Sequence, residues 1–375
     1  MWHLYRILKK FIKPKDVFYC VRKLRDLLFY SSGDIASPFR LQIEPVSQCN
    51  LQCDFCVLSR IRREKKYLSV DHIRKIVDES GARWIQLSGV GETFLHPDII
   101  EIMRLIKARK RILKITTNGL LLNREICRAA VDAGVDYIDV SIDTTDETLY
   151  REIRGGEFPK IIENISYLRD YRNQKKAPLV IGAKHVYNHK NIGNLRSDIE
   201  RLVHSPFDDA FFLWIFDMYE GSSSSSILPE YLTLIHNAME TAKSLGRPDL
   251  VGTLKIFLEN YTFFTGRKKS KVCFEPLYAP YVTVDGDMIA CCKCSMWVLQ
   301  SRHNLQSMLM GNVLETPFMD VWNGKAARRL RCNILENRER FGMCATCEFD
   351  QHVFLKLIRF VAQRIVSIPE KVRHA

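Results

Sequence analysis

The sequence lacks any run of about 18 apolar residues that could span a bilayer. Its apolar segment at 209–216 is typical of a buried strand instead. The N-terminus also lacks an apolar core followed by a small-residue cleavage site, so we expect no signal peptide. Together these absences predict a protein that stays in the cytoplasm.

The middle of the chain has little excess charge, although the net charge of the whole sequence is +13. Residues 1–40 hold nine Lys/Arg and three Asp, and residues 353–375 hold five Lys/Arg and one Glu. A nearly balanced middle argues against a nucleic-acid groove, so we expect no nucleic-acid partner. The extension at 1–39 and the end at 353–375 have the composition of basic amphipathic helices. Such helices pack on the protein body or contact an anionic membrane.

Without an export signal, the twelve cysteines indicate metal ligation rather than disulfides. Ten of the twelve fall into two groups, at 49–56 and 273–347. Cys20 and Cys127 stand apart, and we expect them to be plain buried side chains.

The segment 40–258 alternates apolar strand-like runs with amphipathic helical patterns. We expect strands at 41–45, 84–88, 113–117, 137–142, 179–183 and 210–216, with helices near 70–80, 97–109, 123–133, 159–173 and 192–204. This alternation predicts an α/β fold with a parallel sheet, a partial (β/α)6 barrel whose chemistry lies at the C-terminal strand ends. A helix at about 229–245 and a bridge to 265 follow. Residues 265–352 change to short β elements, including a hairpin at 281–290, and to a helix at 317–331. They predict a small C-terminal α+β domain.

Cys49, Cys53 and Cys56 follow the first predicted strand with the spacing C-x3-C-x2-C. Three thiolates at this spacing can bind one face of a [4Fe-4S] cluster and leave the fourth iron open. An open iron can chelate an amine and a carboxylate. A structural zinc site would need a fourth ligand nearby, and neither His72 nor His96 has ligand spacing.

Over roughly residues 40–350 the sequence resembles the radical S-adenosylmethionine (SAM) superfamily, whose cluster loop has an aromatic residue where Phe55 stands. The resemblance implies a cluster that binds SAM and cleaves it to a 5'-deoxyadenosyl radical. It also implies SAM contacts at the ends of successive strands. The residues implied are Gly89, Gly91 and Glu92 near the methionyl amine, Asn118, Ser141 and Asp143 near the ribose and carboxylate, and Arg154 at the carboxylate. Val90 and Thr93 depart from the Gly-Gly-Glu-Pro element of the family.

Cys273, Cys291, Cys344 and Cys347 can fully ligate either zinc or a second [4Fe-4S] cluster. The segment resembles the SPASM domain and its shortened twitch form, which implies iron and sulfur. Because no cysteine follows Cys347, one auxiliary cluster is predicted. Three other cysteines are then left over: Cys292, Cys294 and Cys332. They are buried thiols, or one of them donates a hydrogen atom to a substrate radical, for which Cys294 is the candidate.

These features predict a radical SAM oxidoreductase or epimerase that acts on a carbinol C–H of a sugar or aminocyclitol-like small molecule. Few residues precede the first strand, which favours a small molecule, or a lipid-linked sugar if the ends contact membrane. A second interpretation is maturation of a ribosomal peptide or protein. A third is a non-enzymatic iron-sulfur or zinc electron carrier or scaffold at a membrane. The implied electron donor is a flavodoxin or ferredoxin.

Overall fold

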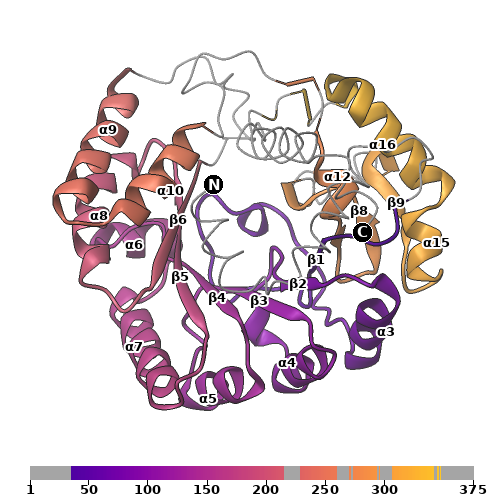
Figure 1. Ribbon diagram of the computed structural model, residues 1–375, viewed down its shortest axis with the longest axis horizontal. Coiled ribbons are helices and arrows are strands. Elements are labelled where there is room, and N and C mark those ends of the chain that lie inside the picture. The colour runs from indigo at the N-terminus through magenta and orange to yellow at the C-terminus, as the bar shows by residue number, and fades with distance from the viewer. Residues whose placement is uncertain are drawn as a thin grey trace, which may run out of the picture.

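The computed structural model describes residues 35–214, 229–259, 270–271, 273–293, 295, 306–341, 344–345 and 347. Residues 1–34 of the predicted N-terminal extension and the predicted helix at 353–375 lie outside these residues, as do Cys20, Cys294 and a serine run at 222–226. Among the described helices, none combines the length and apolar character that a bilayer crossing requires. In Figure 1 the helices form an outer ring around a curved sheet.

Six parallel strands form the core of one sheet, in the order β6-β5-β4-β3-β2-β1. They are β1 (Arg40–Ile43), β2 (Trp84–Leu87), β3 (Ile112–Thr117), β4 (Tyr137–Ser141), β5 (Val180–Tyr187) and β6 (Asp209–Trp214). All six predicted strands are present, and β5 runs four residues beyond its predicted end at 183. The prediction of a parallel α/β sheet is confirmed.

Alternating burial along the strands shows which face meets the helices. In β3, for example, Leu113, Ile115 and Thr117 are buried, whereas Lys114 and Thr116 keep some exposure. The apolar residues pack against the surrounding helices in a single core, because successive strand residues point to opposite faces. The alternate, more polar residues line the inner, concave side.

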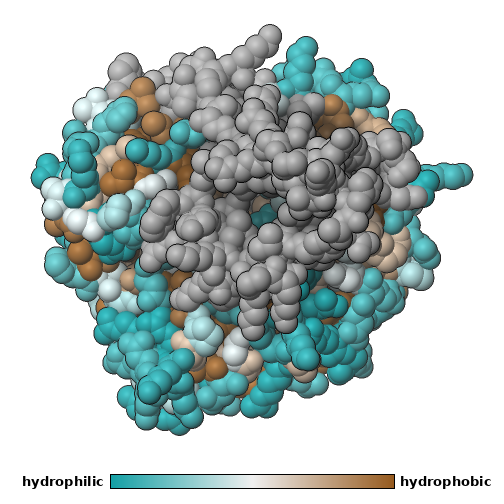
Figure 2. Space-filling model, in the orientation of Figure 1, coloured by the Kyte–Doolittle hydropathy of each residue, from teal (hydrophilic) through white to brown (hydrophobic). Residues whose placement is uncertain are grey.

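The helices of the barrel follow the strands at the periphery (Figure 1). They are α3 (Val70–Ser80), α4 (Ile99–Ala108), α5 (Arg124–Ala133), α6 (Glu147–Arg154), α7 (Phe158–Gln174), α8 (Leu195–Val203), α9 (Pro229–Ser244) and α10 (Pro248–Glu259). Side chains of Ser69, Asn123 and Asp146 accept hydrogen bonds from the first turns of α3, α5 and α6. Hydrophilic side chains predominate on the outer rim over α4, α5 and α7 (Figure 2).

Several predicted boundaries were wrong. The helix near 97 begins at Ile99. Asp98 is its N-cap, so Pro97 lies before the helix and not in its first turn. The predicted bridge after 245 contains a full helix, α10. The helix predicted at 317–331 is two helices, α15 (Phe318–Trp322) and α16 (Lys325–Asn337). The break between them includes Gly324, which is a poor helix former.

Three C-terminal strands extend the same sheet beyond β1. They are β7 (Tyr281–Val282), β8 (Asp287–Ile289) and β9 (Leu309–Asn312), and β7 pairs with β1 in parallel. The predicted hairpin is confirmed, because β7 and β8 pair antiparallel. The short helix α12 (Glu275–Tyr278) precedes it. The two cysteine-bearing regions are therefore joined by main-chain hydrogen bonds.

Candidate functional site

The first cysteine group lies in the loop after β1. Cys53 is buried, Cys49 and Cys56 are half-buried, and all three thiols are free. The Cys56 amide donates to the Cys53 carbonyl at 3.0 Å, a tight turn that leads into the 3-10 helix η1 (Val57–Ser59). Burial raises the pKa of Cys53 to about 12, against the lowering effect of nearby Arg154. Thiolates here require further positive charge, which bound metal supplies.

Three thiols in one loop suit the separate iron atoms of a cluster. Within the part of the chain that the structure describes, no three His, Cys, Asp or Glu side chains converge as ligands of one metal ion would. In a cubane cluster each thiolate binds a different iron atom, so its ligands need not converge on one point.

Glu92 joins the ends of two neighbouring strands. Its side chain accepts hydrogen bonds from Thr117 Oγ1 and the Asn118 amide, both at 2.7 Å. Asn118 Nδ2 in turn donates to Asn50 Oδ1 at 2.7 Å and lies 3.8 Å from Cys49 Sγ. Glu92 is buried, and burial raises its pKa. This network ties the ends of β2 and β3 to the cysteine loop.

Two glycines allow the chain to pass close to that loop. A Cβ at Gly91 would lie 2.2 Å from the carbonyl oxygen of Val46, in the segment that leads to Cys49. At Gly89 a Cβ would lie 2.4 Å from Cγ of Glu44. The missing side chains at these two glycines, which were predicted to contact SAM, thus also let their backbone pack closely against the end of β1 and the residues that follow it. The SAM contacts assigned to both glycines stay predictions.

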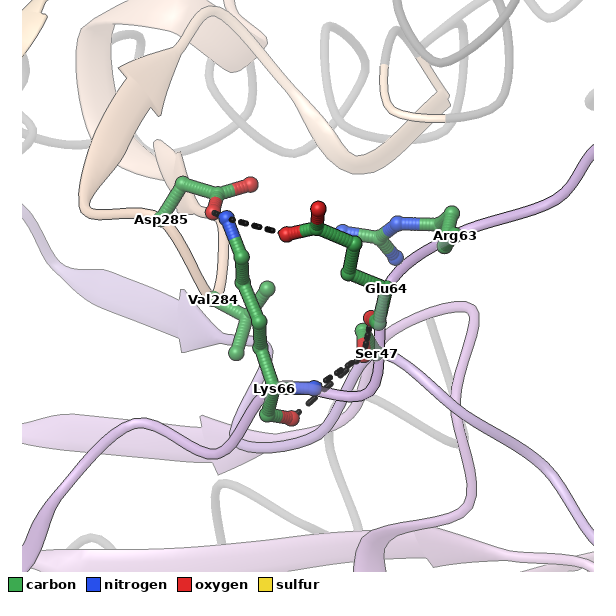
Figure 3. Close-up of a pocket in the computed structure, with 6 residues that line it drawn as sticks. All are labelled: Ser47, Arg63, Glu64, Lys66, Val284 and Asp285. Atoms are coloured by element: carbon green, nitrogen blue, oxygen red, sulfur yellow. Dashed lines mark hydrogen bonds and ion pairs between the residues drawn. The ribbon is translucent and has the colours of Figure 1, made fainter.

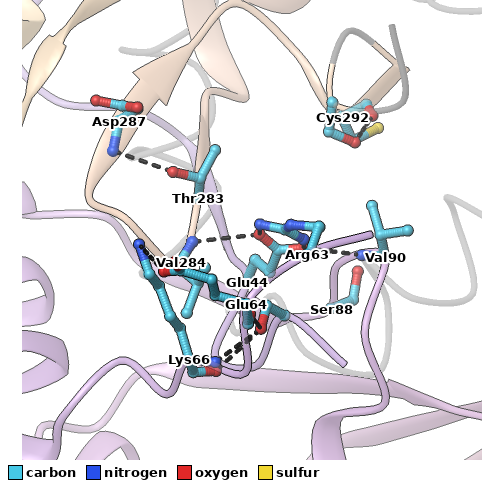
Figure 4. Close-up of polar contacts among 12 residues, drawn as sticks. Glu44, Arg63, Glu64, Lys66, Ser88, Val90, Thr283, Val284, Asp287 and Cys292 are labelled. Atoms are coloured by element: carbon cyan, nitrogen blue, oxygen red, sulfur yellow. Dashed lines mark hydrogen bonds and ion pairs between the residues drawn. The ribbon is translucent and has the colours of Figure 1, made fainter. Parts of the chain in front are cut away.

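Glu44 was not identified from the sequence. It is buried at the end of β1, and Arg63 NH1 and NH2 donate to its two carboxylate oxygens at 2.8 and 3.0 Å. The amides of Val90 and Val284 also donate to it, each at 3.2 Å (Figure 4). Glu44 therefore holds the glycine segment and the β7–β8 hairpin together. The available signal was an acidic residue at the end of an apolar strand.

A pocket adjoins this contact, because Arg63 and Val284 also line it (Figure 3). An ion pair between Lys66 and Asp285, 2.7 Å long and half-exposed, borders it. None of the predicted site residues lines this pocket, and we assign it no role. Its lining residues are Ser47, Arg63, Glu64, Lys66, Val284 and Asp285.

Asp143 and Arg154 form a buried ion pair beside Cys53. Asp143 Oδ1 also accepts the Val186 amide at 2.8 Å, which links the end of β4 to β5. The Cys53 thiol lies 3.9 Å from the Arg154 carbonyl, and Arg154 Nε has no hydrogen-bond partner in the described structure. A buried guanidinium with an unused donor beside the cysteine loop suits an added anion. Arg154 thus fits the carboxylate-binding role that the resemblance implies.

Ser141 and Phe55 complete the predicted SAM site. Ser141 is the last residue of β4, lies opposite Lys184 of β5 and is half-buried. Phe55 is half-buried in the cysteine loop. The strand ends thus bring the cysteine loop, Glu92, Asn118, Ser141, Asp143 and Arg154 to one edge of the sheet.

The second cysteine group is gathered from three segments. Cys273, Cys291, Cys344 and Cys347 are all half-buried, and none of them forms a disulfide. The pKa of Cys273 is raised well above its usual value, chiefly by burial and then by Cys291, with a smaller effect of Cys347. Nearby, Arg40 at the start of β1 pairs with Glu275 at 3.2 Å. Mutual repulsion of neighbouring thiolates is relieved when irons bind them.

Of the leftover cysteines, Cys332 is exposed on α16, so the expectation that it is a buried thiol was wrong. Cys127, which stands apart from both groups, is buried in the core as predicted. Cys292 is half-buried, and its pKa is raised to about 11, mainly by burial and by Cys291. Its thiol is among the groups that raise the pKa of Lys184 on β5. Cys294, the candidate hydrogen donor, lies outside the described residues and stays a prediction.

Two sequence families match the regions just described. Residues 43–186 match the Radical SAM superfamily, and residues 273–348 match the iron-sulfur cluster-binding domain named SPASM. The chain is a radical SAM enzyme with a C-terminal SPASM domain. These domains imply SAM, a [4Fe-4S] cluster that binds it, and an auxiliary iron-sulfur cluster. For the second cysteine group, iron and sulfur therefore replace the zinc alternative.

Relatives of known name differ in how much of the chain they match. A probable GTP 3',8-cyclase of Methanococcus maripaludis is 41% identical over 123 residues, 32% of this chain and 40% of the relative. The chain thus aligns with less than half the length of that relative. A protein of Pyrococcus furiosus named as modifying the cofactor of tungsten-containing aldehyde ferredoxin oxidoreductase is 23% identical over 76% of this chain and 81% of its own.

The SPASM-bearing chain also resembles a solved enzyme over most of its length. Streptococcus suis SuiB bound to SAM has a TM-score of 0.62 at 17% identity, covering 94% of this chain and 82% of SuiB. SuiB has also been solved with its precursor peptide SuiA. At this identity the likeness establishes the fold.

Proposed function

We propose that the enzyme removes a hydrogen atom from a carbinol C–H of a polar small molecule inside the barrel and completes a two-electron oxidation there. When bound, the clusters supply the electron that cleaves SAM and accept the electron that the substrate radical loses. The carbinol gives up one hydrogen atom, one electron and one proton, which converts it to a carbonyl. If the radical instead regains a hydrogen atom on its other face, the outcome is epimerisation.

The observation that carries this proposal is that β1, which leads into the first cysteine group, pairs with β7, and that β7 and β8 form the hairpin that leads to Cys291. On the inner face of β5, burial lowers the pKa of Lys184, whereas Cys292, beside the second group, and Asp143, beside the first, raise it. A substrate near Lys184 is therefore close to both regions. We assign Cys49, Cys53 and Cys56 to the SAM-binding cluster and Cys273, Cys291, Cys344 and Cys347 to the auxiliary one.

The chain's own residues would orient SAM and exclude water. We assign the carboxylate of SAM to Arg154, whose Nε donor is unused. Glu92 and Asn118 would hold the cysteine loop in register with the strand ends. A flavodoxin or ferredoxin would supply the reducing electron.

The substrate class is the less constrained part of the proposal. A sugar or aminocyclitol is the first candidate, because its carbinols suit this two-electron chemistry. A ribosomal peptide is the second, supported by the similarity in fold to SuiB, which has been solved with its precursor peptide. Neighbouring genes discriminate: a short precursor gene favours the peptide, and sugar-nucleotide genes favour the sugar.

The test is anaerobic reconstitution, followed by dithionite and SAM. We expect about eight irons per chain and formation of 5'-deoxyadenosine. In a triple Ala variant at 49, 53 and 56, about four irons should remain and SAM cleavage should disappear. Cleavage at the wild-type rate in that variant would refute the cluster assignment. Isolation of the product after incubation with candidate carbinols tests the oxidation.

A further inference from the structure

The inner face of the barrel carries a row of polar side chains that SAM cleavage does not require. Strand pairing fixes the row: Gln86 lies opposite Lys114, and Ser141 lies opposite Lys184. Between them, Asp139 lies opposite Gly182, where an added Cβ would lie 2.8 Å from Asp139 Oδ1. Because Lys184 is two residues beyond Gly182 on the same strand, both face the interior.

Two lysines of this row have different surroundings. Lys114 forms an ion pair with Asp139 and lies 4.6 Å from the centre of the Tyr137 ring. Lys184 has no carboxylate within ion-pair distance and no side-chain hydrogen bond in the described structure. The other nearby carboxylate, Asp143, is held by Arg154. Among the described residues of this row, Lys184 is therefore a positive charge that forms no ion pair, in contrast to Lys114.

Lys184 is partly buried. Burial lowers its pKa, with a further lowering by Lys114. Asp139, Cys292 and Asp143 oppose the shift. The residue also keeps some accessible surface, so a small ligand can reach it. A partly buried lysine without an ion-pair partner lowers the stability of the fold unless a bound anion neutralises its charge.

The location also fits a bound substrate. The Lys184 carbonyl accepts the Ile142 amide at 2.9 Å, directly beside Asp143 and the predicted SAM site. Cys292, which also acts on the pKa of Lys184, follows the auxiliary ligand Cys291 in sequence. Lys184 thus lies between the proposed source of the radical and the proposed electron acceptor.

We propose that Lys184 binds an anionic group of the substrate, a phosphate or a carboxylate, and so fixes the substrate between the two cysteine groups. The inference rests on the proposed function, since it assumes that the substrate enters this interior. The ammonium group offers three donors to such an anion. Lys114 contributes less, because Asp139 already neutralises it.

The test measures anion binding directly. The full chain, reconstituted with its clusters and saturated with SAM, is titrated calorimetrically under anaerobic conditions with inorganic phosphate, pyrophosphate or acetate. Comparison of the probes separates a phosphate site from a carboxylate site. We expect Lys184→Met to weaken binding of the preferred probe by about tenfold or more, and Lys184→Arg to retain most of it. Lys243→Met, on the exposed side of α9, is the control and should match wild type.

A second variant should change anion affinity in the opposite direction. Asp139→Asn frees Lys114 and adds an unpaired cation to the same interior, so the anion should bind about threefold to tenfold more tightly. A purely structural role for this cluster predicts weaker binding in both variants. If no probe distinguishes wild type from Lys184→Met, or if Asp139→Asn does not strengthen binding, the inference is wrong.

SAM affinity and 5'-deoxyadenosine formation separate this inference from the proposed function. We expect Lys184→Met to bind SAM as wild type does. If the variant loses SAM affinity instead and keeps anion affinity, Lys184 belongs to the SAM site and the inference is overturned. Absence of 5'-deoxyadenosine from the wild type would refute the proposed function while leaving the anion measurement interpretable.

Discussion

The two cysteine groups are built in different ways. Cys49, Cys53 and Cys56 lie within one loop, and hydrogen bonds from neighbouring strand ends hold that loop. The second group spans 273–347 and is assembled from the start of α12, the end of the β7–β8 hairpin and the segment after α16. A local motif specifies its own geometry, whereas a dispersed one depends on the sheet that joins its segments.

The largest expected effect comes from removing the dispersed group alone. Cys273→Ala with Cys347→Ala should leave about four irons and should abolish oxidation of the substrate. SAM cleavage should persist, because the cysteine loop does not depend on these ligands. Iron analysis with separate quantification of 5'-deoxyadenosine and product measures the split. Loss of both activities together would show that the two regions are not separable.

The next effect tests the contact that joins the two groups. Arg63→Met leaves Glu44 buried without its cation, and we expect the free energy of unfolding to fall by about 3–5 kcal/mol. Lys66→Met is a matched control in the same segment, because its ion pair with Asp285 is half-exposed. That variant should unfold close to wild type, because solvent screens an exposed pair. Chemical denaturation compares them, and equal losses would contradict the linking role of Glu44.

A smaller effect is expected at Gly91, beside the local group. Gly91→Ala places a Cβ against the Val46 carbonyl, so we expect a loss of about 3 kcal/mol and slower SAM cleavage. The auxiliary cluster should keep its spectroscopic signal. Gly193→Ala is the control, because nothing lies within 4 Å of its Cβ position. It should be neutral or slightly stabilising. Normal SAM cleavage by Gly91→Ala would show that this close approach does not position the cysteine loop.

The same contrast explains what the sequence could predict. Hydrophobic alternation identified all six barrel strands, because each strand's pattern is local. The cysteine loop was recognisable for the same reason. The roles of Glu44 and Lys184 depend on which strands pair and in what register, which no single segment encodes. Helix α10 was missed because apolar residues recur all round it rather than along one stripe.

The smallest predicted effect concerns the stability that Lys184 costs the fold. Its pKa is lower in the folded protein than in the unfolded chain, so the unfolded chain binds more protons in the pH range between the two values. Stability of the wild type should therefore rise with pH through that range, just below 10.5. At neutral pH, Lys184→Met removes the cost of the charged amine. We expect a gain of about 1 kcal/mol, moderated by the partial exposure of the side chain.

Thermal unfolding of the reconstituted protein without substrate, from neutral pH up to about pH 10.5, measures this gain. The difference between Lys184→Met and wild type should shrink as pH increases, because the wild-type amine loses its proton. If Lys184 serves binding at the expense of stability, its substitution should stabilise the fold and weaken anion binding. If Lys184→Met is less stable than wild type at every pH, Lys184 supports the fold. The assignment of an anion site to the interior between the two cysteine groups would then be wrong.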